Sequence, residues 1–173
     1  MSSSQEPNVC KEEVYNELFR THSKNLHDFL YYKFGPANNP GDIVQEAFYR
    51  LWKKCKDILP EKAKSFLFTA ANNKMLNEIA KAKTALDYQK TPIKSINSET
   101  PEYVFEEHEY MEKLKGALNN LTEDQRVTFM LNRVEGKKHQ EIADMLGISR
   151  KAVEKRIYTT LKILRKELGN KIG

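Results

Sequence analysis

Four charged side chains near the C-terminus have the types and spacing best suited to chemistry in this chain. Residues 139–157 have the sequence HQEIADMLGISRKAVEKRI, in which we expect Gly147 to end a short helix and Ser149 to cap the next one. The first turns of that second helix would present four charged residues away from its apolar side: Arg150, Lys151, Glu154 and Lys155. Arginine and lysine contact guanine edges or phosphates, and glutamate accepts from a cytosine amino group. The pattern predicts a helix-turn-helix that binds DNA.

An ordinary amphipathic helical hairpin with a basic solvent face is the alternative for this stretch. The helix-ending glycine, the serine cap and the basic first turn together favour DNA binding. Four further basic residues on the last helix would contact phosphates or only solubilise the helix: Arg156, Lys162, Arg165 and Lys166. The stretch indicates a class of DNA-binding protein and leaves its role open.

Catalytic motifs are missing from the sequence. It contains no glycine-rich phosphate loop, no dinucleotide fingerprint, no paired His/Glu zinc motif and no nucleophile elbow. Its histidines do not cluster at ligand spacing: His22, His27, His108 and His139. The acidic run at 106–109 could attract a metal, but a solvated face is the favoured interpretation. We therefore expect no enzyme, no metal site and no cofactor.

The charge of the chain is unevenly distributed. The 173 residues have a net charge of +5, with 39% hydrophobic and 31% charged residues, a composition typical of helix-rich modules. Residues 91–112 contain 1 Lys/Arg against 6 Asp/Glu, whereas residues 113–173 contain 14 against 7. Residues 1–90 contain 14 against 11. Two basic segments flanking an acidic one favour a polyanionic partner.

Cysteine usage and hydropathy predict the compartment. Cys10 and Cys55 lie far apart and fit no metal or redox spacing, which favours a reduced, cytoplasmic protein. No apolar run approaches the roughly 20 residues needed to span a bilayer, so we expect no membrane insertion. The first residues, MSSSQEPNVCKEE, lack the pattern of a secretory signal.

Apolar periodicity predicts an all-α fold made of two small helical domains. In the first, residues 9–83, the stretch FGPANNPG at 34–41 ends one long helical segment. The next helix opens at Asp42, as its N-cap or as a first-turn carboxylate. Its apolar positions form a wide face expected to be buried: Ile43, Val44, Ala47, Phe48, Leu51 and Trp52. Residues 56–65 interrupt the pattern, and a third helix follows.

The second domain is expected at residues 111–169 as a four-helix unit. Thr122 and Gln125 have the spacing of a capping box, and Gly136 is a natural helix end. Between the two domains, residues 84–110 contain prolines, Ser/Thr/Asn clusters and acidic residues. This composition predicts a flexible acidic linker.

Two helices of the first domain have features suited to partners. Asp42, Gln45 and Glu46 face away from the apolar side of their helix and would suit a basic partner. The stretch SFLFTAANNKMLNEIAKAK at 65–83 combines aromatic, amide and basic side chains, which can capture unstacked bases of single-stranded DNA. Phe66 and Phe68 can equally be core residues, and for Phe66 we favour that interpretation.

These stretches resemble a known family. DIVQEAFYRLW followed by FLFTAANNKMLNEI resembles region two of bacterial sigma factors. LNNLTEDQRVTFMLNRVEGKKHQEIADMLGISRKAVEKRIYTTLKILRKEL resembles their region four. A chain of this length with only those regions is similar to the extracytoplasmic-function group of alternative sigma factors, and the resemblance covers most of residues 11–169.

The resemblance implies which residues bind which partner. The helix beginning at Asp42 would bind the coiled coil of the largest subunit of core RNA polymerase, while region four would bind the flap. The implied polymerase contacts are Asp42, Gln45, Glu46 and Arg50. The implied contacts to the melted minus-ten element are Lys56, Lys62, Lys64, Asn73, Lys74 and Asn77. Phe66 stands where the family usually has Trp, and Asn72 where it usually has a basic residue.

Region four would bind double-stranded DNA at the minus-thirty-five element. The implied contacts are Lys137, Lys138, Ser149, Arg150, Lys151, Glu154, Lys155 and Arg156. The acidic linker resembles the segment that runs toward the RNA exit path of polymerase, with a bare solvated tether as the alternative. The resemblance also implies an anti-sigma factor or another regulatory or recruiting protein.

A stand-alone helix-turn-helix regulator with an N-terminal interaction domain is the alternative function. It predicts tight operator binding without polymerase. A sigma factor predicts weak DNA binding until core polymerase is present, and promoter-dependent transcripts when it is.

Overall fold

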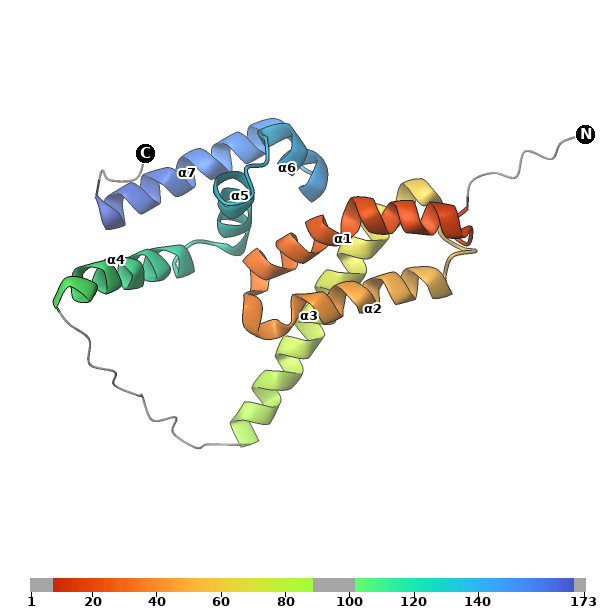
Figure 1. The fold of residues 1–173 in the computed structure, drawn as a ribbon, viewed down its shortest axis with the longest axis horizontal. Coiled ribbons are helices and arrows are strands. Elements are labelled where there is room, and N and C mark those ends of the chain that lie inside the picture. Colours follow the sequence, from red (N-terminus) through yellow and green to blue (C-terminus); the bar gives the residue numbers. More distant parts are fainter. Residues whose placement is uncertain (1–7, 89–101, 170–173) are drawn as a thin grey trace, which may run out of the picture. The chain divides into compact units, whose positions relative to one another are not determined.

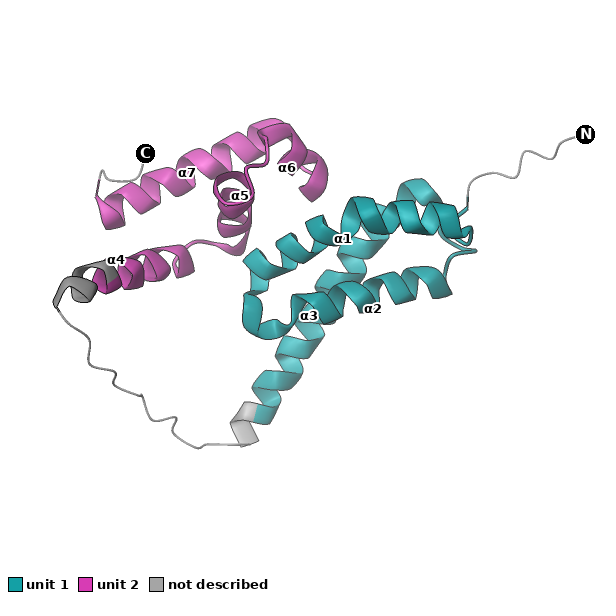
Figure 2. Ribbon diagram, in the orientation of Figure 1, with its two compact units in different colours: residues 1–89 teal, residues 90–173 magenta. Residues whose placement is uncertain are grey.

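The computed structural model describes the backbone of residues 8–88 and 102–169 and the side chains of residues 8–85 and 108–169. The described backbone consists of α-helices, one 3-10 turn and short connections (Figure 1). It divides into two compact units, residues 1–89 and 90–173 (Figure 2). The prediction of an all-α fold with two small helical domains is confirmed.

Unit 1 is a bundle of three helices. They are α1 (Glu12–Phe34), α2 (Pro40–Lys53) and α3 (Pro60–Tyr88), with the 3-10 turn η1 (Pro36–Asn38) between the first two. Each helix packs against the other two. The shared core consists of apolar side chains from all three helices and from Val9: Leu26, Leu30, Ile43, Val44, Ala47, Phe48, Leu51, Ala63, Leu67, Ala71 and Met75. Phe66 and Phe68 both pack against this core.

The α1–α2 junction confirms the predicted break and shifts the helix start. Gly35, at φ +88°, ends α1 and donates its N–H to the Tyr31 carbonyl. Asn39 is left-handed at φ +48°, and Pro40 begins α2, because its fixed φ suits the first helical position. Asp42 is therefore a first-turn carboxylate rather than the N-cap.

The α2–α3 junction is shorter than the sequence pattern suggested. We expected an interruption over residues 56–65, but α3 already begins at Pro60. A proline at the start of a helix loses no intrahelical hydrogen bond, and the following EKAK residues favour helix. Lys62 and Lys64 consequently lie on the first turns of α3, and only Lys56 remains in the connecting loop.

Cys10 and Cys55 form a disulfide, although 45 residues separate them. The prediction of reduced cysteines is therefore wrong for this structure. Val9 is fully buried in the unit 1 core, and Cys55 packs against that same core. The fold thus brings the segment before α1 onto the loop after α2. Spacing along the chain contained no sign of this proximity.

Unit 2 is a bundle built around its last helix. It contains α4 (Glu102–Asn119), α5 (Glu123–Arg133), α6 (His139–Leu146) and α7 (Arg150–Leu168), and α7 packs against the other three. The predicted capping box is present: the Gln125 N–H donates to Thr122 Oγ1 at 3.2 Å, and the Thr122 N–H donates to Gln125 Oε1 at 3.1 Å. The box fixes the residue at which α5 begins.

Both ends of the predicted linker are helical. α3 continues to Tyr88 and α4 begins at Glu102, so residues 84–88 and 102–110 extend the two units. Residues 89–101 lie outside the described residues. Glutamate at the start of α4 suits the positive end of the helix, which helps an acidic segment to be helical.

Candidate nucleic-acid and protein interfaces

The helix-turn-helix is formed by α6, the turn at Gly147 and α7. Lys138 precedes α6, and its backbone N–H donates to Glu141 Oε2 at 2.6 Å. Gly147 ends α6 at φ +68°, a left-handed conformation that costs glycine little. Ser149 Oγ then accepts the Ala152 N–H at 3.1 Å, which confirms the predicted cap. These local bonds fix the start of α7.

One face of α7 is exposed and basic. Lys151, Lys155 and Lys162 follow helical spacing along this face and are all exposed. Tyr158 lies among them with 71% of its surface exposed, the highest value among the exposed large hydrophobic residues. Tyr158 was not predicted from the sequence as a site residue, although its spacing of three from Lys155 and four to Lys162 places it on this face. A phenol between ammonium groups can contact phosphates or sugars through its hydroxyl.

Arg150 and Glu154 form a pair at the start of α7. Arg150 Nε donates to Glu154 Oε1 at 2.9 Å, and both side chains remain substantially exposed, at 63% and 44%. His139 Nδ1 lies 3.7 Å from the same carboxylate oxygen. The pair places guanidinium donors beside a carboxylate acceptor. That combination can contact a guanine and a neighbouring cytosine.

Arg156 lies on a different side of α7 from Lys151 and Lys155. Its Nη2 donates to Asp124 Oδ2 on α5 at 3.0 Å, and its side chain is 27% exposed. The pair joins two helices that are distant in sequence. Arg156 thus has a contact within unit 2 that the sequence did not indicate.

The loop between α5 and α6 is held by backbone contacts. Gly136 is left-handed at φ +65°, the Lys137 N–H donates to the Leu131 carbonyl at 3.0 Å, and Asn132 Nδ2 donates to the Lys137 carbonyl at 2.9 Å. Lys138 is exposed beside it. The loop therefore has a defined conformation next to the start of α6.

The exposed face of α3 contains three of the six predicted single-strand contacts. Lys62, Asn73 and Asn77 share this face with Ser65 and Thr69. Two predicted lysines lie beside it. Lys74 Nζ pairs with Glu78 Oε1 at 2.8 Å, which lowers the pKa of Glu78, and Lys64 lies near His22 of α1. The described part of α3 thus presents amide and hydroxyl groups in a row.

The polar face of α2 contains the four predicted protein contacts. Asp42, Gln45 and Arg50 are exposed and Glu46 is partly exposed. Glu46 Oε1 accepts from Arg50 Nε at 2.9 Å. Lys53 adds a cation near the end of α2, 4.8 Å from the centre of the Tyr49 ring, and its hydrogen bond to Tyr49 raises the pKa of Lys53.

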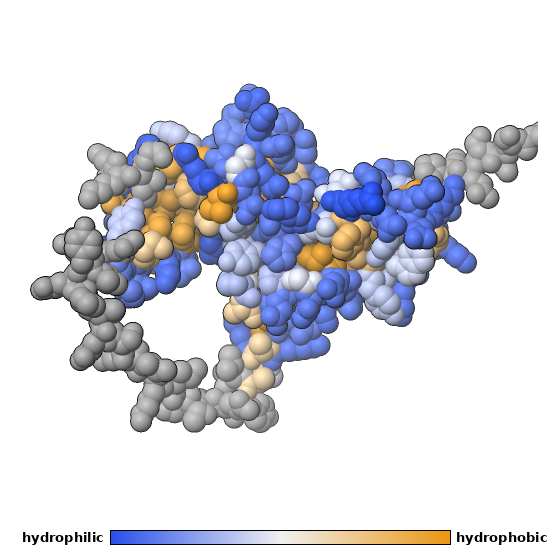
Figure 3. Space-filling model, viewed as in Figure 1, coloured by the Kyte–Doolittle hydropathy of each residue, from blue (hydrophilic) through white to orange (hydrophobic). Residues whose placement is uncertain are grey.

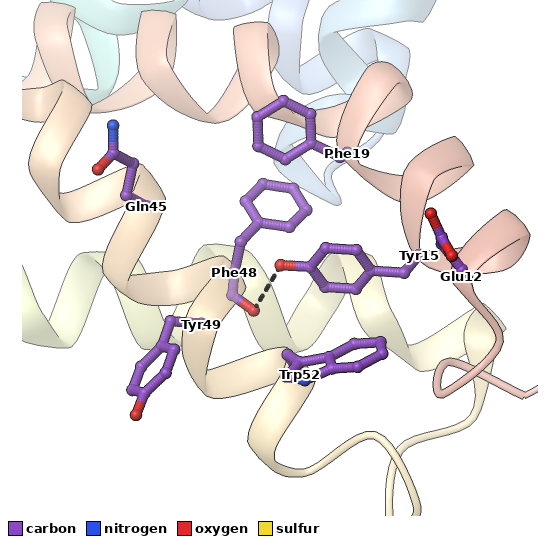
Figure 4. A pocket seen from close by; sticks show the side chains of 7 residues that line it. All are labelled: Glu12, Tyr15, Phe19, Gln45, Phe48, Tyr49 and Trp52. Atoms are coloured by element: carbon purple, nitrogen blue, oxygen red, sulfur yellow. Dashed lines mark hydrogen bonds between the residues drawn. The ribbon is translucent and has the colours of Figure 1, made fainter.

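An aromatic groove lies beside this polar face, between α1 and α2 (Figure 4). Its volume is about 560 Å³, and its lining is mostly aromatic: Glu12, Tyr15, Phe19, Gln45, Phe48, Tyr49 and Trp52. The Tyr15 hydroxyl donates to the Phe48 carbonyl at 3.0 Å, and its ring meets the Trp52 ring edge-on at 5.1 Å. In Figure 3, apolar surface shows between α1 and α2 in an otherwise hydrophilic surrounding.

Trp52 departs from the sequence-based expectation. We expected it on the buried face of α2, but 44% of its surface is exposed. Phe19 and Tyr49 are exposed to a similar degree, at 44% and 52%. Three large exposed aromatic side chains around one groove are unusual on a free surface and indicate a protein contact.

Within the described residues, no group of three or more His, Cys, Asp or Glu side chains is placed to hold a metal ion. None of the helices in this described part of the chain is long and apolar enough to cross a membrane.

Comparisons with known proteins match both units. Residues 18–84 match the family described as Sigma-70 region 2, and residues 111–164 match Sigma-70, region 4. The chain is 25% identical over 165 residues to the ECF RNA polymerase sigma factor SigX of Bacillus subtilis (strain 168), covering 91% of this chain and 84% of SigX. It is 26% identical over 157 residues to the ECF RNA polymerase sigma factor SigE of Mycolicibacterium smegmatis, covering 87% of this chain and 60% of SigE.

A solved structure has a similar fold. The sigma factor RpoE of Bartonella quintana, in complex with the anti-sigma factor NepR, matches with a TM-score of 0.56 at 20% identity. The match covers 93% of this chain and 99% of that one.

Proposed function

This chain belongs to the extracytoplasmic-function group of sigma factors, and from that premise we propose which of its surfaces contact polymerase and promoter. The protein binds core RNA polymerase and directs promoter-specific transcription initiation. The observation that carries this conclusion is the presence of region two and region four, in that order, in one chain. The stand-alone regulator is therefore the disfavoured alternative.

α7 contacts the minus-thirty-five element in the major groove. Its capped N-terminus presents Arg150, Lys151 and Glu154 to base edges. Lys155 and Tyr158, on the same exposed face, contact the DNA phosphates. Lys137 and Lys138 add phosphate contacts from the α5–α6 loop. Arg156 contributes through Asp124, by holding α7 against α5.

α2 and the aromatic groove contact core polymerase. Asp42, Gln45 and Glu46 supply acceptors on a rigid helix, and Tyr49 and Trp52 supply apolar area beside them. Aromatic side chains next to charged groups are typical of the residues that dominate binding energy at interfaces. We expect Trp52→Ala to weaken core binding by about 2 kcal/mol in a competition assay. Unchanged affinity would remove the groove from this interface.

α3 and the loop before it capture the melted minus-ten strand. Lys56, Lys62, Asn73 and Asn77 lie along the loop and the exposed face of α3. Flipping a base out of the stack costs a few kcal/mol, so a surface that binds the flipped base favours the open duplex. Asn73→Ala should lower open-complex formation without changing core binding. Equal open complex in the variant would contradict this assignment.

A transcription assay tests the proposed function as a whole. Purified chain and core polymerase are incubated with enriched genomic fragments, and promoter-dependent transcripts are sequenced. The sigma assignment predicts discrete start sites with both proteins, and weak DNA binding by the chain alone. Tight binding to one operator without polymerase, together with no discrete transcript, would support the stand-alone regulator.

The remaining partners follow from the family. The RpoE relative was solved with an anti-sigma factor, and we expect a comparable regulatory protein to compete with polymerase for the α2 face. A purified regulator that binds the chain without lowering core affinity would contradict this. The chain works in the cytoplasm with polymerase and contributes binding rather than catalysis. Cell fractionation that separates it from polymerase would count against that location.

A further inference from the structure

We propose that the Cys10–Cys55 disulfide is a redox switch that sets how readily region two captures the melted minus-ten strand. The inference rests on the proposed function, because it assigns a regulation to the α3 surface described above.

The disulfide ties the segment before α1 to the loop between α2 and α3. α2 presents the proposed polymerase contacts, and α3 presents the proposed strand contacts. Residues 54–59 therefore connect the two surfaces, and Lys56 of this loop directly follows Cys55. The backbone bonds of the loop reach only nearby residues: the Cys55 N–H donates to the Trp52 carbonyl at 3.2 Å, the Asp57 N–H to the Lys54 carbonyl at 2.9 Å and the Lys62 N–H to the Leu59 carbonyl at 2.9 Å. Cys55 and Ile58 also pack against the unit 1 core, and the disulfide adds a covalent link to a segment 45 residues away.

The surroundings of the two cysteines permit the bond to open and close. Both cysteines are partly exposed residues, so the bond lies near the surface of unit 1, where small thiols and disulfides can approach it. The segment before α1 also has contacts that do not need the bond. Val9 is buried in the core, and Asn8 Oδ1 accepts the Cys10 N–H at 3.0 Å. These contacts keep the two thiols close together after reduction, which favours rapid closure.

The chemistry is thiol–disulfide exchange with a disulfide RSSR of the cellular thiol pool. One cysteine thiolate attacks RSSR, forms a mixed disulfide and releases one thiol, RSH. The second thiolate attacks the mixed disulfide, forms the Cys10–Cys55 bond and releases the second RSH. Two electrons pass from the cysteines to RSSR, and excess RSH reverses both steps. Disulfides of cytosolic proteins are usually transient, with redox-sensing or catalytic roles, so a sigma factor working beside polymerase fits a sensing role.

The oxidised chain forms the open promoter complex more readily than the reduced chain. The bond holds the loop before α3, so Lys56 and the first turn of α3 need less ordering when the strand binds. The reduced loop must lose that freedom during capture. Asp42, Gln45 and Glu46 lie in the first half of α2, and Tyr49 and Trp52 are held by the helix itself, which ends at Lys53 before the bond. Core binding is therefore expected to stay the same.

The test compares full-length chain in three states with core polymerase: oxidised, chemically reduced, and the double variant Cys10→Ser/Cys55→Ser. Permanganate reactivity of the minus-ten thymines measures open complex, and a competition assay measures core affinity. We expect the oxidised chain to give at least about threefold more open complex, with core affinity equal within about twofold. The double variant should match the reduced chain and show no response to reductant.

Equal open complex from oxidised and reduced wild-type chain would overturn the proposal, and this comparison does not depend on how the variant folds. The pair should also equilibrate between thiols and disulfide in glutathione buffers set to cytosolic redox potentials. A bond that stays closed at all of those potentials would be a fixed structural crosslink, which also overturns the switch. Absence of open complex in all three states would contradict the promoter contacts themselves, an outcome distinct from equal opening.

Discussion

The guanidinium of Arg156 on α7 donates a hydrogen bond to the carboxylate of Asp124 on α5 across 3.0 Å. The two residues are 32 positions apart, and the pair joins the DNA-contacting helix to the helix that supports it. An exposed carboxylate limits the strength of such a pair, because water screens it. The ion pair therefore contributes mainly by orienting α7 and adds little to the stability of unit 2.

A double-mutant cycle tests this role. Arg156→Ala and Asp124→Ala should each lower the free energy of unfolding of unit 2 slightly, with a coupling energy of about 0.5–1 kcal/mol. Urea unfolding of the two single variants and the double variant measures that coupling. Purely additive effects would mean that the ion pair contributes nothing. If the pair only orients α7, Arg156→Ala and Asp124→Ala should lower promoter affinity equally, whereas a larger loss for Arg156→Ala would show that Arg156 also contacts DNA.

Arg150→Ala should weaken binding of the polymerase complex to its preferred minus-thirty-five element by about 1–3 kcal/mol, because a bidentate guanine contact is lost. Binding to an element with that base pair replaced should change far less. Lys166→Ala, at the far end of α7, is the matched control and should lower affinity to both DNAs equally. An equal loss for Arg150→Ala on both DNAs would show that Arg150 contacts phosphate instead.

Gln45→Ala combined with Glu46→Ala should weaken core polymerase binding about tenfold, or roughly 1.4 kcal/mol, because two acceptors on the exposed face of α2 are removed. Fluorescence competition with labelled chain measures the affinity. A second double variant, Glu109→Ala with Glu112→Ala, removes two exposed carboxylates from α4 and should bind core normally. The assignment of the α2 face is wrong if both double variants lose the same affinity.

Sequence patterns that involve only a few neighbouring residues predicted the local structure of caps and helix ends well. Thr122 and Gln125 form the expected capping box, Gly147 is left-handed, and Ser149 caps α7. Each depends on hydrogen bonds or backbone angles within a single turn, so the residue types alone suffice. The break at Gly35 follows from the same kind of local rule. These elements also placed the helix-turn-helix correctly.

Contacts between distant segments were not predictable from the sequence. The Cys10–Cys55 bond depends on how α1 and α2 pack, and the Arg156–Asp124 pair depends on how α5 meets α7. Trp52 was expected in the core because its spacing fits the apolar face of α2. It lies at the edge of that face, where it lines the groove between α1 and α2 and meets the Tyr15 ring edge-on without being covered. Periodicity fixes the side of a helix but not how far a neighbouring helix extends over it.

His22 predicts a pH dependence of unit 1. Partial burial and the nearby Lys64 ammonium lower the pKa of His22 below its usual 6.5. The unfolded chain then binds the proton more tightly, so stability from the neutral imidazole is present above pH 6.5 and is lost as pH falls. Urea midpoints should therefore fall from pH 7 to pH 5, and His22→Gln should flatten that part of the profile. An identical profile for wild type and His22→Gln would contradict the linkage.

Ser149 separates helix stability from DNA binding. Its hydroxyl accepts the Ala152 N–H, so Ser149→Ala should lower the free energy of unfolding of unit 2 by about 1 kcal/mol. Ser149→Asn and Ser149→Asp both retain a capping oxygen and should unfold like the wild type. The aspartate, however, places a negative charge beside the phosphates and should weaken promoter binding, whereas the neutral asparagine should not. Equal promoter affinity of the two capped variants would show that the N-terminus of α7 does not approach the DNA backbone.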